Sequence, residues 1–205
     1  MKAIYAGCLG VLFALFALSA PSAWSQDSQE AARKIAVGTC AVCHGDHGNS
    51  QSSLYPRLAG QRENYLAAQL KAFRGQTRGD PDAIAYMWGM ASPLSDGMIN
   101  ALAAYYASQK PASGTAGNPQ VIARGREIYA NGVASENIPA CASCHGANAE
   151  GLADFPRLAG QHSDYVIKQL RSFQNELRDV AVMHGVAKEM KLAELEAVAA
   201  YLQSR

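Results

Sequence analysis

The pentapeptide Cys-x-x-Cys-His occurs twice in this 205-residue chain, at residues 40–44 and again at residues 141–145. Two thiols at this spacing can add across the vinyl groups of a haem as thioethers, and the adjacent imidazole then lies under the iron as its proximal ligand. The residues that would do this are Cys40, Cys43, His44, Cys141, Cys144 and His145. The motifs therefore predict two covalently bound haem c groups and a protein that transfers electrons.

Each iron needs a second axial ligand, and methionine is the natural candidate because a thioether favours Fe(II) and raises the reduction potential. The internal repeat selects Met87 and Met183, since both lie 18 residues before the tyrosine of an Ala-Ala-Tyr sequence. At this alignment no other methionine carries sulfur in both copies. The weaker candidates are Met90, Met98, Met190 and the imidazoles of His47, His162 and His184, and we expect these three histidines at the surface. Met90 and His184, close to the selected pair, stay open as alternatives.

Other residues near the motifs could support the haems. Pro56 and Pro156 follow the two motif histidines by 12 and 11 residues, and their carbonyls could accept a hydrogen bond from the second ring nitrogen of each imidazole. The same prolines could instead only turn the chain before a helix. Arg57 and Arg157 could pair with haem propionates or face solvent. Trp88, beside Met87, has no aromatic counterpart in the second copy and could pack on one haem only.

The chain is a tandem duplication. Residues 55–74 and 155–174 are identical at ten of twenty positions, and the sequence Pro-Arg-Leu-Ala-Gly-Gln occurs in both. Residues 109–119, rich in Pro, Gly and Ser, read as an extended linker. We therefore expect domain 1 over residues 26–111 and domain 2 over residues 112–205.

Helical periodicity dominates both copies. Apolar residues recur at i, i+4 and i+7 in 66–73 and in 166–173, and strand-like alternation is absent. We expect leading helices at 28–37 and 119–131 and closing helices at 96–108 and 191–203. Asp96 is the expected N-cap of a closing helix, and the candidate methionines are expected on loops ahead of these helices. The predicted fold class is all-α, with two small domains that each enclose one haem as added apolar volume.

The N-terminus predicts export. Lys2 precedes an apolar run over residues 3–20, and Ala23 and Ser25 are small residues at −3 and −1 of a cut before Gln26. We expect a cleavable signal peptide at 1–25 and a periplasmic location, with a retained membrane anchor as the alternative. Cleavage removes Cys8, so four of the five cysteines remain, all in the haem motifs.

Charge excludes some partners. The chain has 18 basic and 17 acidic residues, so no basic surplus favours nucleic acid or anionic lipid. A single strongly charged docking face is not expected either.

The two motifs, the repeated Pro-Arg-Leu-Ala-Gly-Gln, the Met-Trp-Gly-Met segment at 87–90 and the Leu-Ala-Ala-Tyr segment at 102–105 resemble the diheme cytochrome c4 family, over nearly all of the mature chain. The resemblance implies two class I cytochrome c domains with haems facing each other across a pseudo-twofold interface. It also implies Met87 and Met183 as ligands, and the carbonyls of Pro56 and Pro156 as hydrogen-bond acceptors for the proximal histidines. The segment 131–139 before the second motif departs from the first copy and makes the domains unequal.

The family resemblance implies a periplasmic carrier, soluble or loosely attached to the membrane, that feeds a terminal oxidase. A cytochrome bc1-type complex or a dehydrogenase could supply its electrons. The sequence leaves two rival functions open, an electron-accepting diheme subunit of a dehydrogenase complex and, less favoured, a diheme redox enzyme. A shared zinc site or a thioredoxin-like site is disfavoured by the adjacent histidines and the absent βαβ pattern.

Overall fold

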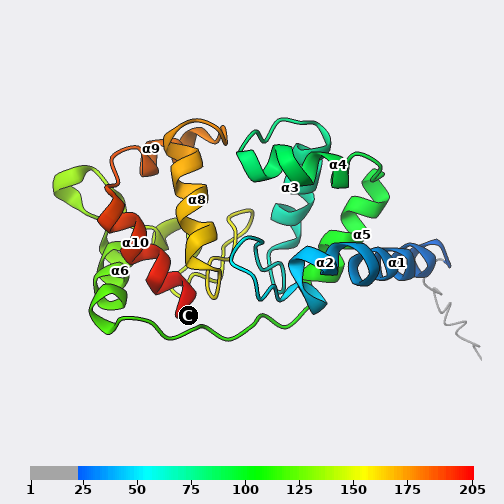
Figure 1. Ribbon diagram of the computed structural model, residues 1–205, viewed down its shortest axis with the longest axis horizontal. Helices are drawn as coiled ribbons and strands as arrows, with labels where there is room; N and C mark the ends of the chain where they lie inside the picture. The colour runs from blue at the N-terminus through cyan, green and yellow to red at the C-terminus, as the bar shows by residue number, and fades with distance from the viewer. Residues whose placement is uncertain (1–22) are drawn as a thin grey trace, which may run out of the picture.

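The computed structural model describes residues 23–205, and these form two helical halves that lie side by side (Figure 1). The predicted signal peptide lies almost wholly outside the described residues. Within them the backbone forms helices and no strand, apart from an isolated antiparallel bridge between Val133 and Ile138. No helix of residues 23–205 has both the length and the apolar character that crossing a membrane requires. The predicted all-α fold is confirmed.

Each half contains five α-helices joined by short π-helical or 3-10 segments. The first half contains α1 (Ala23–Ile35), a π-helix (Ala36–Cys40), α2 (Ala41–His44), a 3-10 turn (Asp46–Gly48), α3 (Glu63–Arg74), a second π-helix (Ala83–Met87), α4 (Trp88–Ala91) and α5 (Asp96–Ala107). The second contains α6 (Pro119–Asn131), a 3-10 turn (Ala134–Glu136), α7 (Ala142–His145), α8 (Ser163–Gln174), α9 (Ala181–Ala187) and α10 (Leu192–Gln203). The expected leading and closing helices are therefore present, with ends shifted by a few residues.

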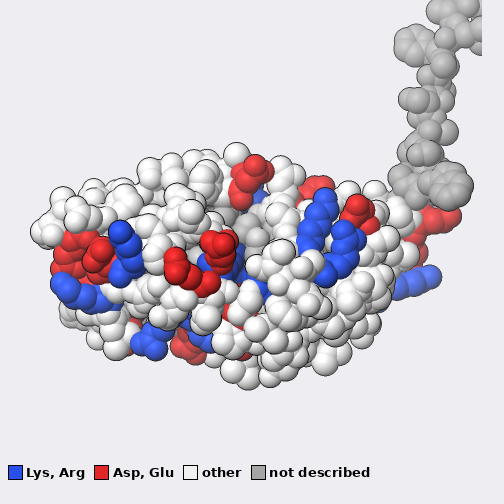
Figure 2. Space-filling model, turned by 90° about the horizontal axis from the view of Figure 1, so that it is seen from above, with Lys and Arg blue, Asp and Glu red and all other residues white. Residues whose placement is uncertain are grey.

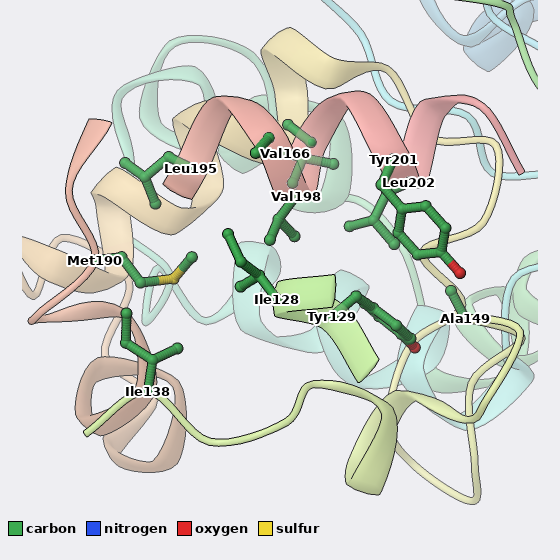
Figure 3. Packing of buried hydrophobic residues seen from close by; sticks show 12 residues of the cluster. Ile128, Tyr129, Ile138, Ala149, Val166, Met190, Leu195, Val198, Tyr201 and Leu202 are labelled. Carbon is green, nitrogen blue, oxygen red and sulfur yellow. The ribbon is translucent and has the colours of Figure 1, made fainter. Parts of the chain in front are cut away.

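The two halves repeat one packing scheme. In the first half α5 packs against α1 and α3, and in the second half α10 packs against α6 and α8. Figure 3 shows the second core, where Ile128 and Tyr129 of α6 face Val198 and Leu202 of α10. The predicted apolar stripes on α3 and α8 supply the other side of each core, because apolar burial is the main force that orients these helices.

The start of α5 differs from our expectation. Ser95 is the N-cap, and its Oγ accepts a hydrogen bond of 3.2 Å from the Met98 N–H. Asp96 is instead the first helical residue, and its carboxylate lies 2.5 Å from the Arg74 guanidinium. Serine and aspartate cap helices about equally well, so the side-chain pairing with Arg74 decides which residue caps.

The extra segment at 131–139 forms a small hairpin-like loop between α6 and α7. Val133 and Ile138 exchange both backbone hydrogen bonds, and Ile138 is buried in the second core. Lys191 contacts Glu136 at 2.5 Å and ties the loop to the start of α10. The insertion thus adds to the core of the second half.

Residues 109–119 run as an extended segment along one edge of the molecule, from α5 to α6 (Figure 1). The Thr115 N–H donates to the Gln203 carbonyl at 2.9 Å, and the Ala112 N–H donates to Asn49 Oδ1 at 2.8 Å. The connecting segment is therefore held against both halves.

A reciprocal pair of glutamines joins the two halves. Gln61 accepts from the Arg157 N–H at 2.7 Å and donates to the Arg157 carbonyl at 2.8 Å. Gln161 makes the same two bonds with Arg57, at 2.9 and 3.0 Å. Because the same residues of both copies are used, the interface has the approximate twofold symmetry of an isologous dimer.

Candidate haem sites

The two motif histidines occupy equivalent places. His44 ends α2 and His145 ends α7, and both imidazoles are buried. The Nδ1 atom of His44 lies 2.9 Å from the Pro56 carbonyl, and that of His145 lies 3.0 Å from the Pro156 carbonyl. A carbonyl only accepts, so each Nδ1 carries the proton and each Nε2 presents a lone pair, the form that binds a metal.

The surroundings favour neutral imidazoles. Burial lowers the pKa of His44 and of His145, while the hydrogen bonds to the proline carbonyls act in the opposite direction. A neutral imidazole with a fixed tautomer is the state that a haem iron requires.

The four motif cysteines are partly buried thiols, and none forms a disulfide. Burial is the largest influence on Cys40 and Cys141, and it raises the pKa of Cys141 to about 11. No group of three or more His, Cys, Asp or Glu side chains among the described residues is arranged to hold a metal ion. Thioether attachment to a haem needs only the pair of thiols that each motif supplies.

An aromatic ring lies beside each motif histidine, which we did not expect from the sequence. The Tyr55 ring stands edge-on to His44, with centroids 6.3 Å apart, and the Phe155 ring stands edge-on to His145 at 6.0 Å. Each ring immediately precedes the proline whose carbonyl holds the histidine. The repeat could have revealed them, because an aromatic residue occupies this position in both copies.

The methionine segments are helical, contrary to our expectation of loops. Met87 is the last residue of a π-helix, and Met183 lies inside α9. The segments begin alike, with the Ile84 N–H donating to the Asp80 carbonyl and the His184 N–H donating to the Val180 carbonyl. π-Helical turns are uncommon and are often found at functional sites. Both methionine side chains are half-buried.

The other methionines have different surroundings. Met190 is buried in the second core (Figure 3), and Met98 packs against the first core. Both therefore fill space, as methionine commonly does. Met90 is 45% exposed in α4.

Trp88 and His184, which directly follow Met87 and Met183, anchor their segments to the backbone. Trp88 Nε1 donates to the Arg78 carbonyl at 2.8 Å, and His184 Nδ1 lies 2.9 Å from the Phe173 carbonyl. His184 Nε2 lies 3.8 Å from the Glu176 carboxylate. Both ring nitrogens of His184 thus face protein oxygens.

The surfaces of the methionine segments fit a large apolar group. Tyr86 and Ile84 in the first half are 53% and 50% exposed, and Val182 in the second half is 55% exposed. Exposed apolar side chains grouped beside metal-binding residues indicate a surface that a ligand covers. In each half a buried imidazole and two thiols form a donor set that fits haem c, and Met87 and Met183 are the candidate thioether ligands.

The two arginines of the repeat bind differently. Arg57 donates from Nη1 to the Gly160 carbonyl at 2.7 Å and from Nε to the Ser50 carbonyl at 3.3 Å, so it bridges the two halves. Arg157 has a buried Nε with no hydrogen-bond partner among the described residues. A buried unpaired N–H is costly unless an acceptor meets it, and a haem carboxylate would be a suitable acceptor.

Comparison with known proteins decides the family. The cytochrome c family model matches twice, over residues 29–110 and 122–205. A cytochrome c4 from Stutzerimonas stutzeri is 39% identical over 178 residues, which cover 82% of this chain and 84% of that protein. A cytochrome c4 structure from Acidithiobacillus ferrooxidans superposes with a TM-score of 0.77 at 42% identity, over 81% of this chain and 98% of that one. The chain belongs to the cytochrome c4 family.

A third relative has a more specific name. The thiosulfate dehydrogenase electron acceptor of Thiomonas intermedia is 37% identical over 182 residues, covering 85% of this chain and 82% of that protein. Taken with the two matched cytochrome c domains, these findings make the chain a diheme electron-transfer cytochrome with two covalently bound haem c groups. Its partners are redox proteins.

The charged surface of this cytochrome c4 is mixed. On the face seen in Figure 2, Lys and Arg side chains lie beside Asp and Glu side chains, and large uncharged areas separate them. The mixture of charges on this face agrees with the net charge of +1.

His162, which we expected at the surface, is buried between the two halves of this cytochrome. Its Nε2 donates to the Ser50 carbonyl of the other half at 2.9 Å. No local pattern predicts this burial, because the residue becomes buried only when the two copies dock. His47 is exposed as expected, and its Nδ1 contacts the Gln109 amide oxygen at 3.0 Å.

We expect the stability of the interface to fall in acid because of His162. Burial lowers its pKa most and Arg57 adds to this, whereas the bond to Ser50 and the charge of Asp164 act in the opposite direction. Below the ordinary pKa of 6.5 the unfolded chain binds a proton that the folded protein resists, so this contribution is present above that pH and is lost as pH falls.

Thermal unfolding of the holoprotein, measured at several pH values between 7.5 and 5, tests this prediction. We expect His162→Gln, which can still donate to the Ser50 carbonyl, to show a smaller acid-dependent fall in thermal midpoint than the wild type. His47→Gln is the matched control at an exposed histidine and should leave the slope unchanged. Equal slopes for His162→Gln and the wild type would contradict the prediction.

Proposed function

We propose that this protein is a periplasmic electron carrier whose two low-spin haems are ligated by His44 and Met87 in one half and by His145 and Met183 in the other. The bound haems would supply one-electron redox chemistry, and these four ligands would leave no position for a substrate at the metal. The observation that carries the proposal is the repeated set of groups. Each half has a buried imidazole held by a proline carbonyl and a half-buried methionine on the helical segment before the closing helix.

In this proposal the residues of the chain attach the haems, orient the imidazoles and fill the axial positions. The cysteine pairs hold the haems covalently, and the carbonyls of Pro56 and Pro156 fix the tautomer and orientation of the two imidazoles. A thioether as the second ligand stabilises the reduced iron and leaves no position for peroxide or another substrate. The haem group supplies the redox chemistry, and the protein sets its potential and its exposure to partners.

We also propose the processing and domain boundaries. Cleavage before Gln26 would leave a mature chain that begins within the first turn of α1, with domain 1 at 26–111 and domain 2 at 112–205, joined by the linker near 109–119. The similar helix packing within each half supports this division. Mass spectrometry of the mature holoprotein tests the cleavage site, and a retained N-terminus would indicate a membrane anchor.

Binding of carbon monoxide tests the absence of an open iron position. We expect the reduced wild-type holoprotein to bind no CO at neutral pH, because both axial positions are filled. A shift of the Soret band at both haems on addition of CO would contradict the carrier proposal and favour a diheme enzyme.

We propose that a terminal oxidase oxidises this cytochrome and that a cytochrome bc1-type complex or a dehydrogenase reduces it. We also propose that the protein associates loosely with the membrane. The second candidate function is the electron-accepting subunit of a periplasmic dehydrogenase, and similarity to the Thiomonas thiosulfate dehydrogenase electron acceptor favours it. Stopped-flow mixing separates the two. Rapid oxidation of the reduced protein by oxidase-containing membranes supports the first, whereas rapid reduction by thiosulfate dehydrogenase with thiosulfate and no oxidation by these membranes supports the second.

A further inference from the structure

A second cluster at the interface involves two buried arginines, Arg78 and Arg178, at equivalent positions of the repeat. Each is 6% exposed, and each guanidinium reaches across to the other half. Arg78 Nη2 donates to Gln169 at 2.8 Å and to Tyr165 at 3.3 Å. Arg178 Nη2 donates to Gln69 at 2.8 Å. These acceptors lie on α3 and α8, which face each other across the middle of the molecule (Figure 1).

Although both guanidinium groups reach across, each stacks on its own half. Arg78 Cζ lies 4.8 Å from the centre of the Phe73 ring, and Arg178 Cζ lies 4.7 Å from the centre of the Phe173 ring. The Arg178 N–H also donates to the Ser172 carbonyl of α8. Both guanidinium groups also share the same two glutamines, because Arg78 Nη1 donates to Gln69 at 2.8 Å and Arg178 Nη1 donates to Gln169 at 2.9 Å. The two charges therefore lie together at the interface, and each is carried by the segment of its own half.

The two halves differ in the carboxylate that accompanies each arginine. Asp80 is 2% exposed, and its Oδ1 accepts from Arg78 Nε at 2.6 Å. The residue two positions after Arg178 is Val180, and Arg178 forms no ion pair among the described residues. The acidic residues near it in sequence, Glu176 and Asp179, are exposed and thus screened by solvent. The cluster holds two buried positive charges and one buried negative charge.

The neighbouring tyrosine reflects this excess. Burial alone would raise the pKa of Tyr65, but Arg178 and Arg78 outweigh burial and leave its pKa below the ordinary value. Tyr65 accepts from Arg178 at 2.7 Å. A phenol oxygen and amide oxygens therefore solvate the unpaired guanidinium in place of a carboxylate.

The unequal charges lie on the segments that lead to the candidate iron ligands. The carbonyls of Asp80 and Val180 close the first turns of the segments that carry Met87 and Met183. A positive charge near a haem favours the reduced iron, whose charge is lower by one, and so raises the reduction potential. Buried charges are only weakly screened, so the imbalance is expected to act beyond the groups in direct contact with it.

We propose that Asp80 sets the difference between the two reduction potentials, because it neutralises the arginine of the first half while the arginine of the second half stays unpaired. The haem of the second half then has the higher potential, and an electron that enters the protein resides mainly there. This inference goes beyond the proposed function and requires only one haem in each half.

Redox titration of the holoprotein tests the proposal, with each potential assigned by NMR contacts between the haem and Tyr55 or Phe155. We expect Asp80→Asn to raise the potential of the first haem more than that of the second, so that the share of the electron on the first haem of half-reduced protein increases several-fold. Val180→Asp should lower the potential of the second haem more than that of the first, and the double variant should reverse the order.

Glu63→Gln removes an exposed carboxylate at the start of α3 and is the matched control, which should leave the difference unchanged. Val180 is 36% exposed, so we expect Val180→Asp to fold and to test the proposal even if Asp80→Asn does not fold. An unchanged difference in Val180→Asp, or an equal change in Glu63→Gln, would overturn the inference. The carrier function would still stand in that case if both variants keep the absorption band of a methionine-ligated oxidised haem and bind no CO.

Discussion

Replacing Met87 by alanine is expected to remove about half of the far-red methionine-to-iron absorption band of the oxidised protein, and Met183→Ala is expected to remove the other half. Each substitution deletes the thioether from one iron only, so one haem stays low-spin and the other opens an axial position. Loss of the thioether also lowers the potential of the affected haem, because methionine ligation favours Fe(II). Visible spectroscopy with CO titration should show one CO bound per protein in each single variant and two in the double variant.

Two further methionines provide the controls. Met90→Ala changes an exposed methionine three residues from Met87 and should leave the band intact. Met190→Leu changes a buried core methionine and should alter stability slightly without affecting the spectrum. Loss of half the band in Met90→Ala, with a normal band in Met87→Ala, would assign the first ligand to Met90 instead.

Gly125→Ala is expected to destabilise the second half strongly. Gly125 lies where α6 crosses α10, and a Cβ at this position would come within 1.9 Å of the Ala197 carbonyl oxygen. The contact is with backbone, so the helices must move apart and lose core packing, at a cost of about 3 kcal/mol or more. The first half buries Ala32 completely where α1 crosses α5, so a methyl group is accommodated in that half.

Thermal unfolding of the holoprotein checks this prediction. A loss of about 3 kcal/mol lowers the midpoint of a domain of this size by roughly 12 °C or more, and the transition of the second half should separate from that of the first. Gly97→Ala, in the first turn of α5, is the control because its Cβ would meet only ordinary contacts. Equal midpoints for Gly125→Ala and Gly97→Ala would show that the helix crossing can relax without loss of packing.

Short motifs and the apolar periodicity of the sequence predicted the haem attachment sites and the helix faces that form the cores. The Cys-x-x-Cys-His spacing predicted two haems, and the apolar stripes of α3 and α8 predicted the faces that form the cores. Alignment of the two copies reduced the methionine candidates to Met87 and Met183. The helical state of these methionine segments was missed, because a short π-helix has no distinct hydrophobic period.

The roles of several polar residues depended on the contact between the halves. His162 was expected at the surface but is buried against Ser50, and Arg57 proved to be a bridge between halves. Trp88 and His184 differ in chemistry, yet both anchor a methionine segment to a backbone carbonyl. Their equivalence is visible only when the two helical segments are compared in space.

The sequence by itself determined that this protein is a duplicated, all-helical cytochrome with two covalent haem motifs, because attachment chemistry and helical periodicity are both read from neighbouring residues. Only the tertiary structure decided how the two copies meet. Their docking buries Arg78 and Arg178 together and leaves Asp80 as the single buried carboxylate between them. Charges more than a hundred residues apart in sequence interact strongly only when folding places them close together and removes them from water, so the asymmetry of the two halves is a property of the fold.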